Sequence, residues 1–196
     1  MKIGIDIRRA GGFGVGTYTK NLVCALARAD SDHNFVLIGR PEHRQHLGEL
    51  PANFGFEPYE RRYDAPRSHL TYGFALDHLG LDTLHVPHRW VPLSAPRPYV
   101  ATLHDLNNIL FPSTDESKFK QNLAISALRR GLRRAAKVIT VSNATKQDAI
   151  KRLGLAERNL EVVYDAVDDQ VAQPVTEGER QRTLERYSIS YPFILY

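Results

Sequence analysis

Short apolar runs alternate with amphipathic segments along the whole chain. The runs that we interpret as buried strands cover residues 3–7, 34–39, 83–86, 99–103, 137–141 and 160–164, with a weaker run at 54–59. Between them, apolar residues three or four positions apart predict helices, of which the longest spans 118–136. Continuous apolar strands that alternate with helices are typical of an α/β fold with a parallel sheet covered on both faces.

Apolar residues three or four positions apart mark these helices. In the longest helix these residues are Phe119, Leu123, Ala127, Leu128, Leu132 and Ala135, and in the first helix they are Tyr18, Leu22, Ala25 and Ala29. A helix over 68–79 carries Leu70 and Phe74 four residues apart. Shorter helices are expected at 41–50 and 178–187, and a proline-rich loop at 87–98. Ser142 or Asn143 is expected to cap a helix that ends before Gly154.

A glycine cluster joins the first strand to the first helix, at Gly11, Gly12, Gly14 and Gly16. Glycine lets the chain turn sharply and lets backbone N–H groups approach a ligand, and the start of a helix adds donors that suit an anion. The cluster therefore predicts a site for a phosphate-bearing ligand near Gly14–Thr17. A tight turn between strand and helix, without any ligand, explains the same glycines.

Polar residues gather where the predicted strands end, which is the edge where parallel sheets bind ligands. They are Arg8–Gly16, Pro87–Trp90, His104-Asp105 and Ser142-Asn143. A histidine there can bind a polar substrate or stabilise developing charge, or it can bond to the backbone of a loop. Pro87 separates His85 from His88 and no third ligand is evident, so we expect no metal site.

The composition is that of a soluble globular protein, with 42% hydrophobic and 24% charged residues. No apolar run is long enough to cross a membrane, and Asp6, Arg8 and Arg9 interrupt the first one, which excludes a signal-peptide core. Cys24 is the single cysteine, so no internal disulfide can form. These features favour a cytoplasmic protein.

The net charge of +4 is unevenly placed, because residues 118–152 hold ten Lys or Arg and a single acid, Asp148. Four of them, Arg129, Arg130, Arg133 and Arg134, are arginines spaced i, i+4 on the longest helix. Such a basic amphipathic helix can rest on an anionic membrane surface, although a solvated charged face explains it equally well. No nucleic-acid partner is expected, because aromatic residues are not interleaved with the basic ones.

Two other function classes stay open at this point. The glycine run does not have the G-x-G-x-x-G spacing of a dinucleotide site, and the second strand ends at Gly39-Arg40 instead of an acid. An arginine there suits a 2′-phosphate, so an NADP-linked oxidoreductase is one alternative. A non-catalytic module that binds a membrane surface is the other.

Four segments, in order, resemble glycosyltransferase family 4. They are Gly14–Tyr18 with Asn21-Leu22, then Thr102–Leu106 as a T-x-H-D-L motif, Leu132–Ser142 leading to Val-Ser, and Asp148–Val163. The resemblance spans nearly the whole chain. One departure is Asp165-Ala166-Val167-Asp168, where the family commonly has Asn-Gly-Val-Asp, and alanine tolerates a positive φ poorly.

The resemblance implies a GT-B architecture, in which two Rossmann-like domains with doubly wound parallel sheets face a cleft. Residues 1–175 would be the N-terminal, acceptor-side domain. Residues 176–196 would be a linker helix and, from Phe193, the first strand of a donor-binding domain that is otherwise outside this chain. The family transfers a sugar, such as mannose, from a GDP- or UDP-sugar to a glycan or lipid-linked acceptor. It retains the anomeric configuration and needs neither metal nor cofactor.

The resemblance also implies roles for particular residues. His104 and Asp105 would be catalytic, with His104 beside the transferred sugar, and Gly14, Val15, Gly16 and Ser142 would bind the donor. For the acceptor we select Arg8, Tyr18, His88 and Trp90, which lie at or near the strand ends. The function expected is polysaccharide or glycolipid synthesis in the cytoplasm, on the inner face of the membrane if the arginines bind it. This part of the enzyme alone is expected to be inactive.

Overall fold

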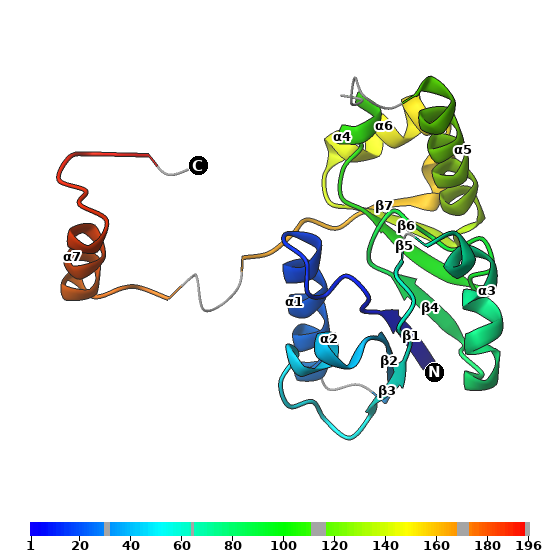
Figure 1. Ribbon diagram of the computed structural model, residues 1–196, viewed down its shortest axis with the longest axis horizontal. Helices are drawn as coiled ribbons and strands as arrows, with labels where there is room; N and C mark the ends of the chain where they lie inside the picture. Colours follow the sequence, from blue (N-terminus) through cyan, green and yellow to red (C-terminus); the bar gives the residue numbers. More distant parts are fainter. Residues whose placement is uncertain (30–31, 64, 111–116, 168–172, 195–196) are drawn as a thin grey trace. The chain divides into compact units, whose positions relative to one another are not determined.

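The computed structural model divides the chain into two units, Met1–Asp165 and Ala166–Tyr196. It describes residues 1–29, 32–63, 65–110, 117–167 and 173–194 (Figure 1). The first unit holds the complete sheet. The second unit holds one polar helix, α7 (Glu177–Arg186), whose first turn is closed by a capping box between Thr176 and Glu179.

Seven parallel strands form one sheet in the order β3-β2-β1-β4-β5-β6-β7. Their bounds are Lys2–Asp6 (β1), Asn34–Gly39 (β2), Phe54–Pro58 (β3), Thr83–Val86 (β4), Tyr99–Leu103 (β5), Lys137–Thr140 (β6) and Leu160–Val162 (β7). Each coincides with an apolar run of the sequence, so the prediction of a parallel α/β sheet is confirmed. The strand order reverses between β1 and β4, which makes that point of the sheet edge the expected place for a ligand.

The helices of the first unit connect these strands. They are α1 (Val15–Arg28), α2 (Pro41–Gln45), α3 (Pro66–Leu76), α4 (Asn107–Leu110), α5 (Lys118–Arg134) and α6 (Asn143–Leu153), with short 3₁₀ turns at Asp77–Leu79 and Glu157–Asn159. Ser142 caps α6, as predicted, and Gly154 ends it with a left-handed backbone. The one-turn helix α4 was not predicted, and α2 is shorter than the predicted 41–50.

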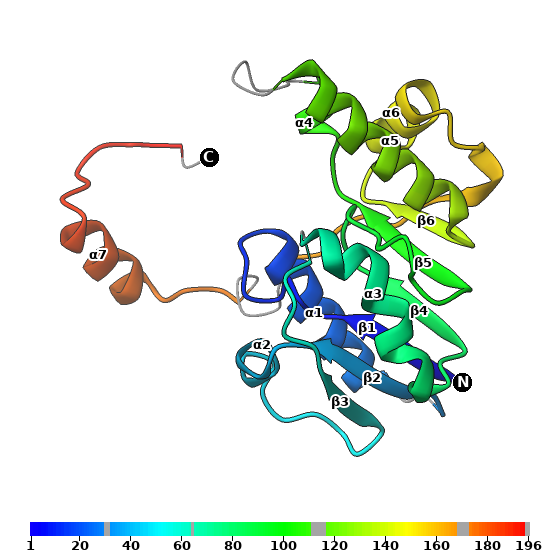
Figure 2. The ribbon, with the colours of Figure 1, turned by 45° about the vertical axis from the view of Figure 1, so that its right-hand side comes forward.

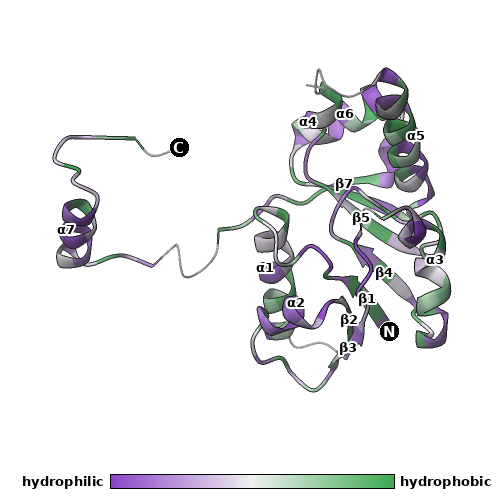
Figure 3. Ribbon diagram, in the orientation of Figure 1, coloured by the Kyte–Doolittle hydropathy of each residue, from purple (hydrophilic) through white to green (hydrophobic). Residues whose placement is uncertain are grey.

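Helices cover both faces of the sheet, and each face has its own core (Figures 1 and 2). Side chains alternate between faces along a strand, so Phe35 and Leu37 pack under α1 and α2, whereas Val36 and Ile38 pack under the other helices. The larger core gathers side chains of α3, α5 and α6. Figure 3 shows hydrophobic residues concentrated on the strands, with hydrophilic residues along α5 and α7.

The predicted apolar stripe of α5 is correct only for its C-terminal half. Leu128, Leu132 and Ala135 are buried, but Phe119 is 78% exposed and Leu123 is 62% exposed. The reason is that only the later turns of α5 lie over the sheet. The periodicity of a helix shows which residues share a face, but it does not show how far the neighbouring layer extends.

The helices predicted after the glycine cluster and at 68–79 are confirmed as α1 and α3, but burial along them does not follow the apolar spacing. On α3 the buried residues are Ser68, Tyr72 and Leu76, and Leu70 and Phe74 are exposed. On α1 the buried residues are Gly16, Thr19 and Val23. Ser68 is buried where it accepts from Arg8, and Gly16 packs against Ala10 O, whereas Thr19 donates to Val15 O within α1 itself. Hydrophobicity alone does not predict such positions.

The last segment of the chain was predicted to begin another strand at Phe193. The described part of it, Pro192–Ile194, has no regular secondary structure. Leu195 and Tyr196 lie outside the described residues, as does Asp168 of the Asp-Ala-Val-Asp segment.

The proline-rich segment 87–98 is a loop, as predicted, and it runs between α3 and α5. Ser94 fixes it to α3, because its N–H and Oγ both donate to His69 O at 3.0 Å and its Oγ accepts from Gly73 N at 3.1 Å. On the other side Arg134 Nη1 donates to Leu93 O at 2.8 Å. The backbone can approach α3 this closely because Gly73 has no side chain. A Cβ at that position would lie 1.7 Å from Ser94 O.

We therefore expect Gly73→Ala to lower the free energy of unfolding by about 2–3 kcal/mol, because the loop must move away from α3. Urea unfolding followed by circular dichroism measures the change. Gly55→Ala on β3 is the matched control, since its Cβ would make an ordinary contact of 3.8 Å with Phe35 O. Equal stability of the two variants would contradict this account of the loop.

Candidate functional site

The carboxyl ends of β1, β4, β5 and β6 place most of the predicted site residues along one edge of the sheet. Arg8 follows β1, His88 follows β4, His104 follows β5 and Ser142 follows β6. The N-termini of α1 and α6 lie at the same edge, because each follows the strand that ends there. The parallel sheet therefore brings together residues that are more than a hundred positions apart in the sequence.

The glycine loop leads directly into α1. Gly14 precedes the helix with φ 57°, a left-handed conformation that glycine adopts without strain, and no side chain caps the first turn. The first N–H groups of α1 therefore keep their capacity to donate to an anion. Gly16 has a structural reason to be glycine, since a Cβ would lie 2.8 Å from Ala10 O. Of the two glycines, Gly14 is exposed and Gly16 is buried.

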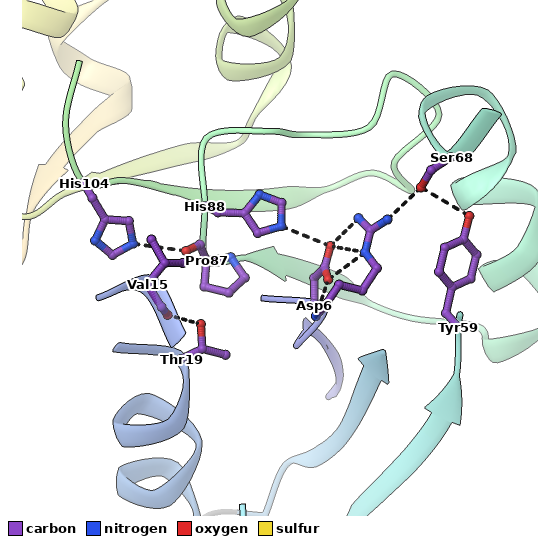
Figure 4. A network of polar contacts seen from close by, with 9 residues as sticks. Asp6, Val15, Thr19, Tyr59, Ser68, Pro87, His88 and His104 are labelled. Atoms are coloured by element: carbon purple, nitrogen blue, oxygen red, sulfur yellow. Dashed lines mark hydrogen bonds and ion pairs between the residues drawn. The ribbon is translucent and has the colours of Figure 1, made fainter. Parts of the chain in front are cut away.

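His104 is half-buried at the end of β5, and its imidazole is held from two sides. Nε2 lies 3.1 Å from Pro87 O (Figure 4), and the ring of Tyr18 meets the imidazole edge-on at 4.7 Å between centroids. Because a carbonyl oxygen only accepts, Nε2 must carry the proton. In the neutral ring Nδ1 then holds the lone pair and can accept a hydrogen bond from a hydroxyl.

A short polar chain supports Tyr18 from beneath. The Tyr18 hydroxyl lies 3.3 Å from Thr102 Oγ1, and Thr102 Oγ1 lies 2.9 Å from His85 Nε2. Burial lowers the pKa of His85 to about 4 and raises the pKa of Tyr18, so both are neutral near pH 7. The hydroxyl of Tyr18 thus points into the sheet, and its ring faces His104.

The first turn of α6 completes this group. Ser142 Oγ accepts from Thr145 N at 3.1 Å, and Thr145 Oγ1 donates to His104 O at 3.2 Å. The cap of α6 is therefore tied directly to the residue at the end of β5. The structure brings His104, Tyr18 and Ser142 together, next to the start of α1.

Arg8 was predicted to contact the acceptor, which requires an exposed side chain, but the structure buries it. It is 5% exposed, and Nη2 donates to Asp6 Oδ2 at 2.6 Å, while Nε donates to Asp6 Oδ1 at 2.9 Å. Nη1 donates to Ser68 Oγ on α3 at 2.7 Å, and the guanidinium lies 4.1 Å from the centre of the Tyr72 ring. The polar side chains of this group thus join β1 to α3.

His88 belongs to the same buried group. It is 1% exposed, and its Nε2 lies 3.5 Å from Asp6 Oδ2 (Figure 4). Burial lowers the pKa of His88 against the opposing effect of the Asp6 carboxylate. His85, by contrast, lies on the α1 side of the sheet, so the two histidines do not converge. Among the described residues no three His, Cys, Asp or Glu side chains are grouped as a metal site would need.

Asp105 and Trp90 flank the His104 group and are linked through Arg89. Arg89 Nη1 donates to Asp105 Oδ1 at 3.0 Å, and the Arg89 guanidinium lies 5.8 Å from the centre of the Trp90 ring. Asp105 Oδ1 also accepts from Asn107 N at 3.1 Å, at the start of α4. Asp105 therefore organises the backbone that follows His104.

Sequence analysis missed the residues that hold this site, chiefly Asp6, Ser68, His85, Thr102 and Thr145. A signal for two of them was present, because Asp6 and Thr102 are polar residues inside otherwise apolar strands. Asp6 and Arg8 are also two positions apart at a strand end, which places them on one face of the sheet. Ser68 and Thr145 gave no such signal, since the contacts that matter here, of Ser68 with Arg8 and of Thr145 with His104 O, join segments far apart in sequence. In the described part of the chain no helix is both long and apolar enough to cross a membrane.

Comparison with known proteins gives one family match. The model of Glycosyltransferase Family 4 matches residues 13–171, which is more than half of the chain. No curated protein matches the chain by sequence.

Solved structures share the fold. HepE of Anabaena in complex with UDP-glucose has a TM-score of 0.62 and 14% identity, over 96% of this chain and 50% of that one. A glycosyltransferase from Rickettsia africae ESF-5 has a TM-score of 0.53 and 14% identity, over 97% of this chain and 50% of that one. The lipopolysaccharide outer core galactosyltransferase WaaB, in its apo form, has a TM-score of 0.52 and 15% identity, over 86% of this chain and 46% of that one. The chain thus spans about half the length of the structures it matches.

The buried pair makes a testable contribution to stability. Burial alone would raise the pKa of Asp6, but the charge of Arg8 and the contact with His88 outweigh it and hold that pKa well below its usual range. Asp6→Asn leaves the Arg8 charge buried without its partner, and we expect a loss of about 3–5 kcal/mol at pH 7. Urea unfolding of both proteins measures the difference.

The pH dependence follows from the lowered pKa. The contribution of Asp6 is complete above the unfolded-state pKa of about 4, and it declines as the pH falls further, because the unfolded chain takes up the proton first. The stability gap between wild type and Asp6→Asn should therefore narrow from pH 6 to pH 3. Asp77→Asn, at an exposed site on the same unit, is the control. A gap that stays constant with pH would contradict a lowered pKa.

Proposed function

Because the chain belongs to glycosyltransferase family 4, we propose that residues 1–175 form the acceptor-side, N-terminal domain of a GT-B glycosyltransferase. In this proposal the enzyme moves a hexose, such as mannose or glucose, from a GDP- or UDP-sugar to a glycan or lipid-linked acceptor. Residues 176–196 lead into the donor-binding domain. HepE, whose fold the chain shares, was solved with UDP-glucose, which supports a nucleotide sugar as the donor class.

The observation that carries the proposal is the fixed orientation of His104. Its Nε2 is committed to Pro87 O, so Nδ1 is the atom left to meet a substrate, and that atom accepts a hydrogen bond. Sugars offer hydroxyl donors in abundance. We assign His104 the role of holding a hydroxyl of the transferred sugar, with the Tyr18 ring and the backbone bond to Thr145 keeping the imidazole in place.

The donor diphosphate is assigned to the start of α1 and the adjacent cap of α6. Gly14 leaves the N–H groups of Val15 and Gly16 without a side-chain cap, and Ser142 stands at the next helix N-terminus along the edge. As the bond from the anomeric carbon to the diphosphate oxygen breaks, negative charge grows on the leaving group. Preorganised N–H donors stabilise that charge. The new bond forms to the acceptor oxygen, whose proton passes to the leaving diphosphate, without a metal or cofactor and with retention.

The acceptor assignments change with the geometry. Arg8 donates to Asp6 and Ser68 inside the protein, and His88 is buried with its Nε2 facing Asp6, so we assign both residues to the support of the segment that carries Pro87. Trp90 remains the proposed acceptor contact, and Asp105 orients Arg89 beside it. Tyr18 acts through its ring on His104, because its hydroxyl is bonded to Thr102.

We expect His104→Ala, in the chain joined to its donor-binding domain, to lower kcat by roughly 10²-fold, the scale for a positioned polar group. His46→Ala, which changes an exposed histidine outside the site, is the control. Initial rates with saturating UDP-glucose or GDP-mannose and thermal unfolding are measured together. A folded His104→Ala enzyme with wild-type turnover would overturn the proposed role.

We also propose that the enzyme works at the cytoplasmic face of a membrane, in polysaccharide or glycolipid synthesis. Of the four α5 arginines, Arg133 and Arg134 donate to Gly154 O and Leu93 O inside the protein. Arg133 is also exposed, but Arg129 and Arg130 are exposed and their side chains make no hydrogen bond within the described part of the chain, so we assign these two to the anionic surface.

Cosedimentation with vesicles of anionic lipid tests the surface assignment. Binding should weaken steeply between 0.05 and 0.5 M salt, on the order expected for screened charges, and should fall in the double variant Arg129→Ser/Arg130→Ser. Arg180→Ser on α7 is the control. Salt-independent binding, or binding unchanged in the double variant, would refute a contact through these arginines.

A further inference from the structure

A cavity of about 330 Å³ lies on the α3 and α5 side of the sheet, beside the loop that follows β4. Its apolar walls include Leu70 of α3, Trp90, Val91 and Leu93 of the loop, and Ala127 and Leu128 of α5. Figure 2 shows α3 and α5 on the same side of the sheet. The volume is at the lower end of the range for ligand sites in proteins, which suits one chain-like molecule better than a folded partner.

The chemistry of the walls excludes a sugar ring as the main occupant. Among the described residues that line the cavity, Arg89 and His69 are the polar ones, and none is an acid, an amide or a hydroxyl. Sugar sites need several such groups to bind hydroxyls. An apolar lining with a tryptophan instead suits a hydrocarbon chain, which gains free energy from each methylene removed from water.

The positive charges around the cavity favour an anionic head group on this hydrocarbon chain. The sequences of α3 and α5 contain no Asp or Glu, whereas α3 carries Arg67 and α5 carries lysines and arginines at both ends. Arg89 lies at the cavity itself, with its guanidinium 5.8 Å from the Trp90 ring. A planar guanidinium pairs well with phosphate oxygens. Asp105 occupies Nη1 of Arg89, but no acid among the described residues pairs with Nη2 or Nε, and the basic residues of α3 and α5 outnumber this one carboxylate. The surroundings therefore complement an amphiphile with an anionic phosphate head.

The cavity is connected to the proposed reaction site through the contact between Arg89 and Asp105. Arg89 Nη1 contacts Asp105 Oδ1 at 3.0 Å, and Asp105 directly follows His104. A head group on Arg89 would lie beside the end of β5, so a sugar attached to it could extend toward His104. The position of the cavity is thus suited to the lipid part of an acceptor.

We propose that this cavity binds the hydrocarbon chain of a lipid phosphate that carries the acceptor sugar, with the phosphate on Arg89. The inference rests on the proposed glycosyltransferase function for the identity of the sugar-carrying ligand. It selects the lipid-linked acceptor over a free glycan and names the cavity residues that would bind it. The binding itself requires neither the donor sugar nor turnover.

Trp90 is the single tryptophan of the chain, so its fluorescence reports on the cavity directly. We would titrate the 196-residue chain with decyl phosphate below its micelle concentration, and with decanol and inorganic phosphate as separate probes. The proposal predicts a saturable change in Trp90 emission with decyl phosphate. It predicts at least tenfold weaker binding of decanol, and no saturable change with inorganic phosphate.

Matched variants locate the site. Leu70→Ser changes a cavity wall and Phe74→Ser changes the next turn of α3 outside the wall, and both side chains are exposed, at 62% and 82%. We expect at least tenfold weaker binding for Leu70→Ser and unchanged binding for Phe74→Ser. Ala127→Phe, which fills the cavity, should abolish binding, with thermal unfolding as the check on its fold.

Absence of a saturable response in the wild-type chain would overturn the proposal, and so would equal binding by Leu70→Ser and Phe74→Ser. Equal affinity for decanol and decyl phosphate would refute the role of Arg89. Because fluorescence needs no donor, decyl phosphate binding by a chain whose full-length enzyme transfers no sugar would leave the cavity assignment standing and remove the transferase proposal. Sugar transfer by the full-length enzyme, without decyl phosphate binding by the chain, would support the transferase proposal and overturn the cavity assignment.

Discussion

The buried ion pair between Asp6 and Arg8 is the interaction on which the functional edge of the sheet depends. It joins the end of β1 to α3 through Ser68, and to the segment after β4 through His88. A buried pair is costly to desolvate, so its value lies less in net stability than in permitting one arrangement of these segments. Each of the three guanidinium nitrogens donates to a partner within the protein, Nε and Nη2 to Asp6 and Nη1 to Ser68, which makes this arrangement hard to replace.

The ion pair also helps to position His104, through His88 and its neighbour Pro87. His88 Nε2 lies against Asp6, and the carbonyl of the neighbouring Pro87 accepts from His104 Nε2. Figure 4 shows Asp6 and His104 on opposite sides of the Pro87–His88 segment. Tyr18, supported by Thr102 and His85, fixes the other side of the imidazole. The chemistry proposed for His104 thus depends on residues that need not touch a substrate, and rigid support of this kind is what positions a polar group within a few tenths of an ångström.

The sheet could be predicted from sequence because each strand is a short apolar run, and the inner strands such as β2 and β5 are largely buried on both faces. The positions of Ser142 and His104 followed from the strand ends. The burial of Ser68 could not be predicted, since only the fold brings its partner Arg8 near. The apolar spacing does not mark Thr19 either, because its hydroxyl donates to Val15 O in the same helix. Arg8 and His88 were assigned to the acceptor because strand-end residues are commonly exposed, whereas the structure buries both beside Asp6. The spacing of Asp6 and Arg8 indicated that they share one face of the sheet, but only the structure shows that they form an ion pair.

The central claim is that this chain supplies one side of a nucleotide-sugar site, and thermal unfolding with ligands tests it most directly. UDP-glucose, GDP-mannose and NADPH would be added to the 196-residue chain and to the chain joined to its donor-binding domain. A ligand that binds only the folded state raises Tm, by several degrees when its concentration is about a hundred times Kd. The account predicts a rise with one of the nucleotide sugars in the longer protein and none with NADPH. A rise with NADPH in the 196-residue chain would contradict it and favour an oxidoreductase.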